Sequence, residues 1–171
     1  MTRSRAAVPA VMLGVAALGV LADQATKHWA LEALPSVAPD DYNWFGGLLR
    51  FRLAFNSGAA FGMGSNSTMV FSVLSLVAGL ALLVFCCMRL RLLWQGALAG
   101  VLLAGIVGNL IDRLTREPGP FRGLVVDFIA LKWFAVFNVA DIFITCGAIA
   151  LGLLAIIAER RKVDMLTWEP R

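Results

Sequence analysis

The amino-acid sequence predicts a mainly α-helical membrane protein, with four transmembrane helices and a small extracytoplasmic β-sheet lying on the outer membrane surface. Three observations lead to this fold class. Hydrophobic residues make up 60% of the chain and the mean hydropathy is +0.80, whereas only about half of a soluble domain is apolar. Four apolar runs lack any charged residue. The long segments between them contain patterns that are typical of strands.

The four uncharged runs define the expected helices. Each contains about 17 to 22 residues, which at about 1.5 Å per residue spans the roughly 30 Å of a hydrocarbon core. We therefore expect a single integral membrane domain over residues 1–171. Its helices are expected at approximately 6–29, 67–88, 92–113 and 139–158, and its outer loops at approximately 30–66 and 114–138.

The first apolar run also has features of a secretory signal peptide, because Arg3 and Arg5 precede it and small residues lie near Ala22. However, Asp23 and Lys27 continue a helical pattern beyond its end. We therefore expect a helix that is retained in the protein.

The outer loops are expected to carry strands. In LLRFRLAF, residues 48–55, leucine and phenylalanine lie on one face and Arg50 and Arg52 on the other, which predicts a half-buried strand. Residues 123–138 are rich in β-branched and aromatic side chains and are too short to cross a membrane as a helix. Three tryptophans are expected at the headgroup level, where an indole keeps its N–H hydrated: Trp29, Trp44 and Trp133.

Basic residues at the helix ends indicate the orientation. Four crossings place all of them on one side of the membrane, and the excess of Lys and Arg in short loops marks the cytoplasmic side. Both termini are therefore expected in the cytoplasm and the long loops at the extracytoplasmic face. The basic residues used are Arg3, Arg5, Arg89, Arg91, Arg160, Arg161 and Lys162.

Composition excludes several classes of function. The net charge is +4, but no basic patch interleaved with aromatic residues accompanies it, so no nucleic-acid partner is expected. The only histidine is His28, and Cys86, Cys87 and Cys146 lack the spacing of metal ligands, so we expect neither a metal nor a cofactor. Nothing in the sequence requires more than one copy, and we expect a monomer surrounded by membrane lipids.

Seven polar residues are expected at one level, near the extracytoplasmic ends of the helices. A carboxylate costs roughly 2.5–3.5 kcal/mol at the centre of a transmembrane helix and less near the interface. Several such groups together indicate a functional cleft rather than chance. The residues are Asp23, Lys27, Asn109, Arg113, Asp127, Asn138 and Asp141.

Most of these residues also have a purely structural interpretation. Asp23 and Lys27 are four positions apart and can form a salt bridge within a helix. Arg113 can extend its charged end to the interface. Asn138 and Asp141 are placed to cap the fourth helix. The carboxylate in VVDFI is the hardest to explain in this way, because the strand around it offers no local partner.

Two carboxylates held close together have a specific chemistry. At roughly 3.5–4 Å and an effective dielectric constant near 20, two negative charges repel by about 4–5 kcal/mol, which corresponds to about three pKa units. Such a pair keeps one proton, so one member is a base and the other an acid. A water between them can attack a carbonyl while the acid polarises it. Asp127 and Asp141 therefore predict an aspartic-protease arrangement.

Five short motifs occur in order along the chain. They are DQATK at residues 23–27, NSGAAFG at 56–62, GNLIDR at 108–113, VVDFI at 125–129 and FNVAD at 137–141. Together they resemble the lipoprotein signal peptidases, also called signal peptidase II. The resemblance extends from the first expected helix to the fourth, and it is specific because all five motifs occur in the same order in a four-helix chain.

The resemblance implies an aspartyl endopeptidase of the bacterial cytoplasmic (inner) membrane. Its substrates would be diacylglyceryl-modified prolipoproteins, cut just before the lipidated cysteine, and globomycin-type inhibitors would block it. By position, Asp127 and Asp141 match the catalytic pair. The residues that match site-lining or substrate-binding positions are Asn56, Gly58, Asn109, Arg113 and Asn138, and those that match supporting positions are Asp23 and Lys27.

Other functions stay open on the residues alone. An intramembrane serine protease would use Ser57 with His28 as its base, although no expected helix brings both to the midplane. A proton or ion transporter would use intramembrane Asp and Lys as a relay, although no ionisable residue occupies the middle of an apolar run. A purely structural protein with four helices would have no activity that depends on the aspartates.

Overall fold

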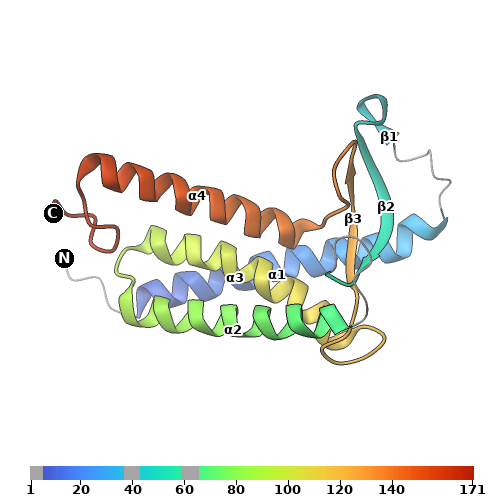
Figure 1. The fold of residues 1–171 in the computed structure, drawn as a ribbon, viewed down its shortest axis with the longest axis horizontal. Coiled ribbons are helices and arrows are strands. Elements are labelled where there is room, and N and C mark those ends of the chain that lie inside the picture. The colour runs from blue at the N-terminus through green and yellow to red at the C-terminus, as the bar shows by residue number, and fades with distance from the viewer. Residues whose placement is uncertain (1–5, 37–42, 59–65) are drawn as a thin grey trace.

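The computed structural model describes residues 6–36, 43–58 and 66–171. In this part of the chain there are four long helices and three strands (Figure 1). Two strands lie between α1 and α2 in the sequence, and the third lies between α3 and α4. The helices are α1 (Ala7–Ala33), α2 (Asn66–Arg89), α3 (Leu93–Thr115) and α4 (Val139–Arg161), and the strands are β1 (Asn43–Trp44), β2 (Leu49–Asn56) and β3 (Val125–Leu131). Short 3-10 turns lie at Leu34–Ser36 and Phe45–Gly47.

The predicted fold class is confirmed. The four helices of the described residues are each long and apolar enough to cross a membrane, and the strands form one small antiparallel sheet. All four helices continue beyond the expected ends, to Ala33, Arg89, Thr115 and Arg161. A helix can continue past the apolar run because its backbone hydrogen bonds do not depend on lipid.

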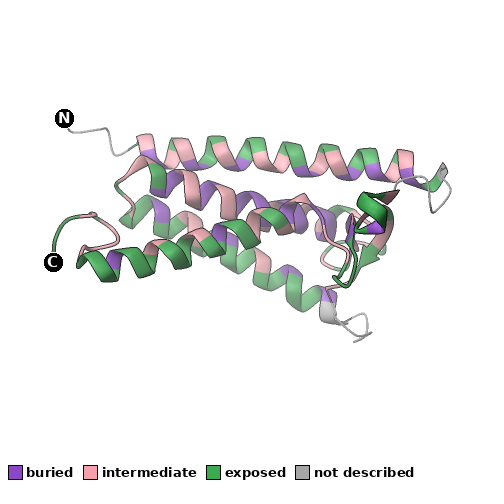
Figure 2. Cartoon of the chain, turned by 90° about the horizontal axis from the view of Figure 1, so that it is seen from above, coloured by how far each residue is buried: buried purple, intermediate pink, exposed green. Residues whose placement is uncertain are grey.

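Helix α3 forms the centre of the bundle. Of its most apolar stretch, 56% is buried, against 11% for α2 and for α4. Small residues allow this close approach, as is common between membrane helices. A Cβ atom at Gly100 would lie 2.6 Å from the carbonyl oxygen of Met12 in α1, and one at Gly105 would lie 2.5 Å from that of Ala140 in α4. Figure 2 shows that exposed residues follow the outward faces of the helices.

The sheet crosses one end of the bundle, opposite the end where α1 begins and α4 ends (Figure 1). Its order is β1-β2-β3, and Ala54 of β2 pairs with Asp127 of β3 beyond a register shift. The sheet packs on the end of α1 through Phe128, whose ring lies 6.1 Å from that of Trp29. Because side chains alternate across a strand, this contact turns the neighbouring Asp127 to the opposite face.

The outer strands agree with the sequence. Strand β2 covers the predicted strand at residues 48–55 almost completely, and β3 lies inside the predicted β-rich segment 123–138. Trp44 and Trp133 are exposed on the sheet and the loop after it, as a headgroup position requires. Of the basic residues that indicate orientation, Arg3 and Arg5 lie outside the described residues.

The packing of α1 against α3 can be tested at Gly108. A Cβ atom there would lie 2.6 Å from Oδ2 of Asp23. We expect Gly108→Ala to lower the free energy of unfolding by about 1–3 kcal/mol, the usual cost of overpacking, although alanine otherwise favours a helix by about 1 kcal/mol. The measurement is thermal unfolding in detergent or lipid. Gly152→Ala is the matched control, because nothing lies within 4 Å of its Cβ; equal midpoints would contradict the close approach.

Candidate active site

The seven polar residues predicted to share one level lie together at the end of the bundle that the sheet crosses. They come from α1, α3, β3 and the start of α4. Six are buried and Asp141 is half-buried. Hydrogen bonds and a salt bridge connect them into one network, together with Asn56 at the end of β2 and Gly58 just after it.

Asp127 is held in β3 by two asparagine side chains. Its Oδ1 accepts a hydrogen bond from Nδ2 of Asn138 at 2.6 Å, and its Oδ2 accepts one from Nδ2 of Asn56 at 2.9 Å. Burial raises the pKa of Asp127 to about 6, and the charge of Asp141 acts in the same direction, against the hydrogen bonds and the charge of Lys27. This carboxyl group therefore keeps its proton to a higher pH than an ordinary aspartate does.

Asp141 lies in the first turn of α4. Its Oδ1 accepts from Nδ2 of Asn109 at 2.8 Å, and its Oδ2 accepts from the backbone N–H of Asn138 at 3.2 Å. In return, Oδ1 of Asn138 accepts from the backbone N–H of Asp141 at 3.0 Å. This is a reciprocal cap of the helix. The capping interpretation is thus confirmed, and the cap also fixes the direction of the Asp141 side chain.

Two amide groups link the aspartates. Asn138 donates from Nδ2 to Asp127 and also to Oδ1 of Asn109, at 3.1 Å, while Asn109 donates to Asp141. An amide oxygen only accepts and an amide nitrogen only donates, so both donor ends point to carboxylates. The arrangement supports negative charge on either aspartate while keeping the two in electrostatic contact.

Asn56 owes its orientation to a left-handed turn. Its Oδ1 accepts from the backbone N–H of Gly58 at 2.7 Å, which turns Nδ2 toward Asp127. Gly58 has φ of +84°, and a Cβ atom there would lie 2.6 Å from the ring of Phe71. Both the conformation and the space therefore require glycine at this position.

Lys27 occupies the centre of the network and is fully buried. Its Nζ lies 2.8 Å from Oδ2 of Asp23, 2.8 Å from Oδ2 of Asp112 and 3.0 Å from Oδ1 of Asn109. The predicted salt bridge between Asp23 and Lys27 is confirmed. Each N–H of the ammonium group has one acceptor, which is how a buried charge is tolerated.

Asp112 is the residue that the sequence analysis missed. It is fully buried and accepts from Lys27, from Nε of Arg116 at 2.8 Å and from the backbone N–H of Val126 at 3.1 Å. The signal was present, since positions 109, 112 and 113 share one face of a helix.

Arg113 is 9% exposed and does not extend to the interface. Its Nη1 is 3.3 Å from the carbonyl oxygen of Asn109, and its charge interacts with those of Asp141, Asp112 and Asp127. Within the described part of the chain, its Nε is buried without a hydrogen-bond partner. A buried, unused donor beside two carboxylates is available to a ligand.

His28 takes no part in this network. Its side chain is 73% exposed and its Nε2 lies 3.1 Å from Oε1 of Glu32, so it lies on the exposed surface of α1. Within residues 6–36, 43–58 and 66–171, no group of three or more His, Cys, Asp or Glu side chains is placed to hold a metal ion.

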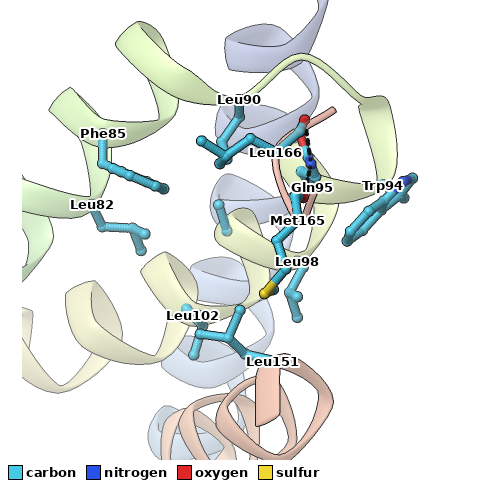
Figure 3. A pocket seen from close by; sticks show the side chains of 11 residues that line it. Leu82, Phe85, Leu90, Trp94, Gln95, Leu98, Leu102, Leu151, Met165 and Leu166 are labelled. Atoms are coloured by element: carbon cyan, nitrogen blue, oxygen red, sulfur yellow. Dashed lines mark hydrogen bonds between the residues drawn. The ribbon is translucent and has the colours of Figure 1, made fainter. Parts of the chain in front are cut away.

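Two cavities differ in what they can do. A groove of about 280 Å³ beside Asp141 is otherwise lined by apolar or weakly polar side chains, among them Phe134, Phe137 and Ile142. A cavity of about 430 Å³ lies at the other end of the bundle (Figure 3). Its described lining has no ionisable side chain, and the amide of Gln95 is occupied by the carbonyl oxygens of Met165 and Leu166. Only the first groove adjoins groups suited to catalysis.

The fold and the site define an integral membrane protein with a cluster of hydrogen-bonded carboxylates and amides at one end of its bundle. A family model described as signal peptidase (SPase) II matches residues 15–157. The chain belongs to the signal peptidase II family. It is therefore a multi-pass bacterial membrane peptidase that processes signal peptides, which confirms the resemblance noted in the sequence.

Individual relatives agree with this assignment. The chain is 40% identical over 155 residues to the lipoprotein signal peptidase of Streptomyces coelicolor, covering 91% of this chain and 72% of that protein. It is 38% identical over 163 residues to that of Mycobacterium avium, covering 90% and 87%. A solved bacterial membrane enzyme, determined by the in meso method, is similar in fold with a TM-score of 0.73, 28% identity and coverage of 90% and 92%.

The contribution of the Asn56 turn can be tested through Gly58. We expect Gly58→Ala to displace the N–H that holds Oδ1 of Asn56, and with it the bond from Nδ2 of Asn56 to Asp127. Turnover should fall by up to about tenfold, since a hydrogen bond is worth about 0.5–1.5 kcal/mol. Turnover is measured on a lipidated prolipoprotein, per folded enzyme. Gly46→Ala is the control, because Gly46 also has positive φ but no neighbour within 4 Å. Equal turnover in the two variants would contradict this role.

Proposed function

We propose that the chain is an aspartyl endopeptidase that removes the signal peptide from diacylglyceryl-modified prolipoproteins, cutting just before the lipidated cysteine. Membership of the signal peptidase II family supports a lipoprotein precursor as substrate. The observation that carries the catalytic assignment is the connection of Asp127 to Asp141 through Asn138 and Asn109.

The environments of the two aspartates suggest their roles. Asp127 lies in an apolar strand where burial raises its pKa to about 6, so it is the member that holds the proton. Asp141 lies at the N-terminus of α4 and accepts hydrogen bonds from Asn109 and Asn138, and a helix N-terminus favours negative charge. We therefore assign Asp141 as the resting base and Asp127 as the resting acid.

The proposed reaction needs one water and these two groups. Asp141 takes a proton from the water as its oxygen attacks the peptide carbonyl before the cysteine, and Asp127 gives its proton to the carbonyl oxygen. The C–N bond of the resulting tetrahedral intermediate then breaks. Asp141 returns its proton to the cysteine amine, and Asp127 recovers a proton from the intermediate. The products are a free carboxyl terminus on the signal peptide and a new N-terminal cysteine.

Arg113 is suited to hold the substrate. Its Nε, which has no partner within the described residues, can donate to a backbone carbonyl of the peptide. Asn56 and Asn138 each donate a hydrogen bond to Asp127. In a buried site such donors act without the reorganisation that water would require, which favours the developing charge on oxygen.

The site also fits a substrate that arrives from the membrane. The groove beside Asp141 is largely apolar, so it offers a lateral route to the carboxylates from the lipid. Three of the basic residues that indicate orientation, Arg89, Arg160 and Arg161, end α2 and α4 on the side away from the site. Their position supports a cytoplasmic C-terminus and an extracytoplasmic site. We further propose that the enzyme acts as a monomer and is sensitive to globomycin-type inhibitors.

Removal of either carboxylate tests the proposal directly. We expect Asp127→Asn and Asp141→Asn each to lower cleavage of a lipidated prolipoprotein by about 10³-fold or more, because each loses a proton-transfer group. The readout is the gel shift of the processed protein. Glu32→Gln is the control and should leave cleavage unchanged, since Glu32 is an exposed carboxylate in the last turn of α1. Wild-type cleavage in either aspartate variant would refute the proposed dyad.

The pH dependence tests the assignment of the acid. Asp127 loses its proton above about pH 6, so kcat/KM should fall as the pH rises through that value, since it reports the free enzyme. The hydrogen bond from Asn56 favours the charged form and lowers this pKa. Asn56→Ala should therefore move the falling limb to higher pH. A limb that stays in place or moves to lower pH would contradict the assignment.

A further inference from the structure

We propose that Asp112 is a positioning residue which, with Asp23 and Lys27, sets the spacing of the two aspartates by holding the backbone immediately before each of them. This inference rests on the proposed dyad. It follows from three contacts that meet at one ammonium group, and none of the three requires substrate.

Asp112 holds the strand. Strand β3 is at the edge of the sheet, and the N–H groups of an edge strand lack partners on one side. Oδ2 of Asp112 accepts from the N–H of Val126, the residue before Asp127, at 3.1 Å. On the other side of Asp127, the N–H of Phe128 donates to the carbonyl oxygen of Phe137 at 3.1 Å. The backbone is thus fixed on both sides of the carboxylate.

Asp23 holds the helix in the same way. The first N–H groups of a helix have no partner within it. Oδ1 of Asp23 accepts from the N–H of Ala140 at 2.9 Å, and Ala140 precedes Asp141. Since Asp23 lies in α1, the contact fixes the start of α4 against the first helix. The two carboxylates that flank Lys27 therefore make equivalent contacts, one before each proposed catalytic aspartate.

Lys27 joins these two contacts and adds a third. Its Nζ bonds both carboxylates at 2.8 Å and donates to Oδ1 of Asn109 at 3.0 Å. An ammonium group can only donate, so the amide oxygen of Asn109 must face Lys27. Its Nδ2 is then left facing Asp141. One cation thus sets the strand, the helix and the direction of the amide between them.

The charges of this cluster are balanced without help from substrate. Asp23 and Asp112 are compensated by Lys27 and by Arg116, whose Nε lies 2.8 Å from Oδ1 of Asp112. Within the described residues, Asp112 forms no hydrogen bond with Asp127 or Asp141 and does not line the groove. Its effect on the reaction is therefore transmitted through geometry, and a displacement of about 1 Å at a reacting group can lower a rate by about 10²-fold.

The experiment compares three variants of the full-length enzyme in lipid with lipidated prolipoprotein. We expect Asp112→Ala to lower kcat by about 10²-fold with KM within about twofold, because substrate binding is not touched. Asp112→Asn keeps an oxygen for Lys27 and Val126, and should recover kcat to within about tenfold of wild type. Arg116→Gln removes a bond to the other oxygen of the same carboxylate and should change kcat by less than about threefold.

The amount of folded enzyme is measured in parallel by thermal unfolding. The proposal fails if Asp112→Ala keeps the wild-type kcat per folded molecule, if KM rises while kcat does not change, or if Asp112→Asn or Arg116→Gln loses as much kcat as Asp112→Ala. It also fails if neither Asp112 variant folds, because the carboxylate is then needed for the fold as a whole. Asp127→Asn in the same assay separates this failure from failure of the dyad, since only the latter leaves that variant active.

Discussion

A buried ammonium group needs three acceptors, and the way Lys27 finds them determines the rest of this site. Removing a charge from water costs several kcal/mol unless partners compensate it, so the three acceptors must come close and stay in place. They lie on α1 and α3, as Asp23, Asp112 and Asn109. Close approach of these helices is possible because glycines line α3. The glycines of α3 therefore allow its acceptors to come close enough to compensate the charge of Lys27 on α1.

The position of Lys27 also determines how two asparagine side chains are oriented. Once the oxygen of Asn109 faces Lys27, its nitrogen must face Asp141, and the next amide, of Asn138, must present its nitrogen to Asn109 and Asp127. Asparagine suits this role because its amide accepts a hydrogen bond on one side and donates one on the other, and it carries no charge. A lysine or arginine in either place would neutralise the aspartates, and both would then stay ionised. The neutral amides hold the pair and still allow one proton to be kept.

Much of this arrangement is readable from the sequence because membranes impose simple rules. Uncharged runs mark the helices, and polar groups among apolar ones, such as Asp127 and Asp141, mark the candidate site. What the sequence does not contain is the partner of each group. Asp112 bonds Val126, fourteen residues away, and Asp23 bonds Ala140, more than a hundred away. Such pairs depend on how helices and the sheet pack, and neither spacing nor hydropathy encodes that.

The position of the dyad reconciles two opposed needs of hydrolysis in a membrane. Water must reach the scissile bond, yet a raised carboxyl pKa needs burial. The two aspartates divide these needs: Asp127, in strand β3, is 2% exposed, whereas Asp141 is half-buried and borders a groove. A site deeper in the bilayer would keep the carboxyl pKa raised but would lack water. A site in the exposed loops would have water, but its carboxyl pKa would not be raised. Only the end of the bundle, with a sheet across it, supplies one aspartate of each kind.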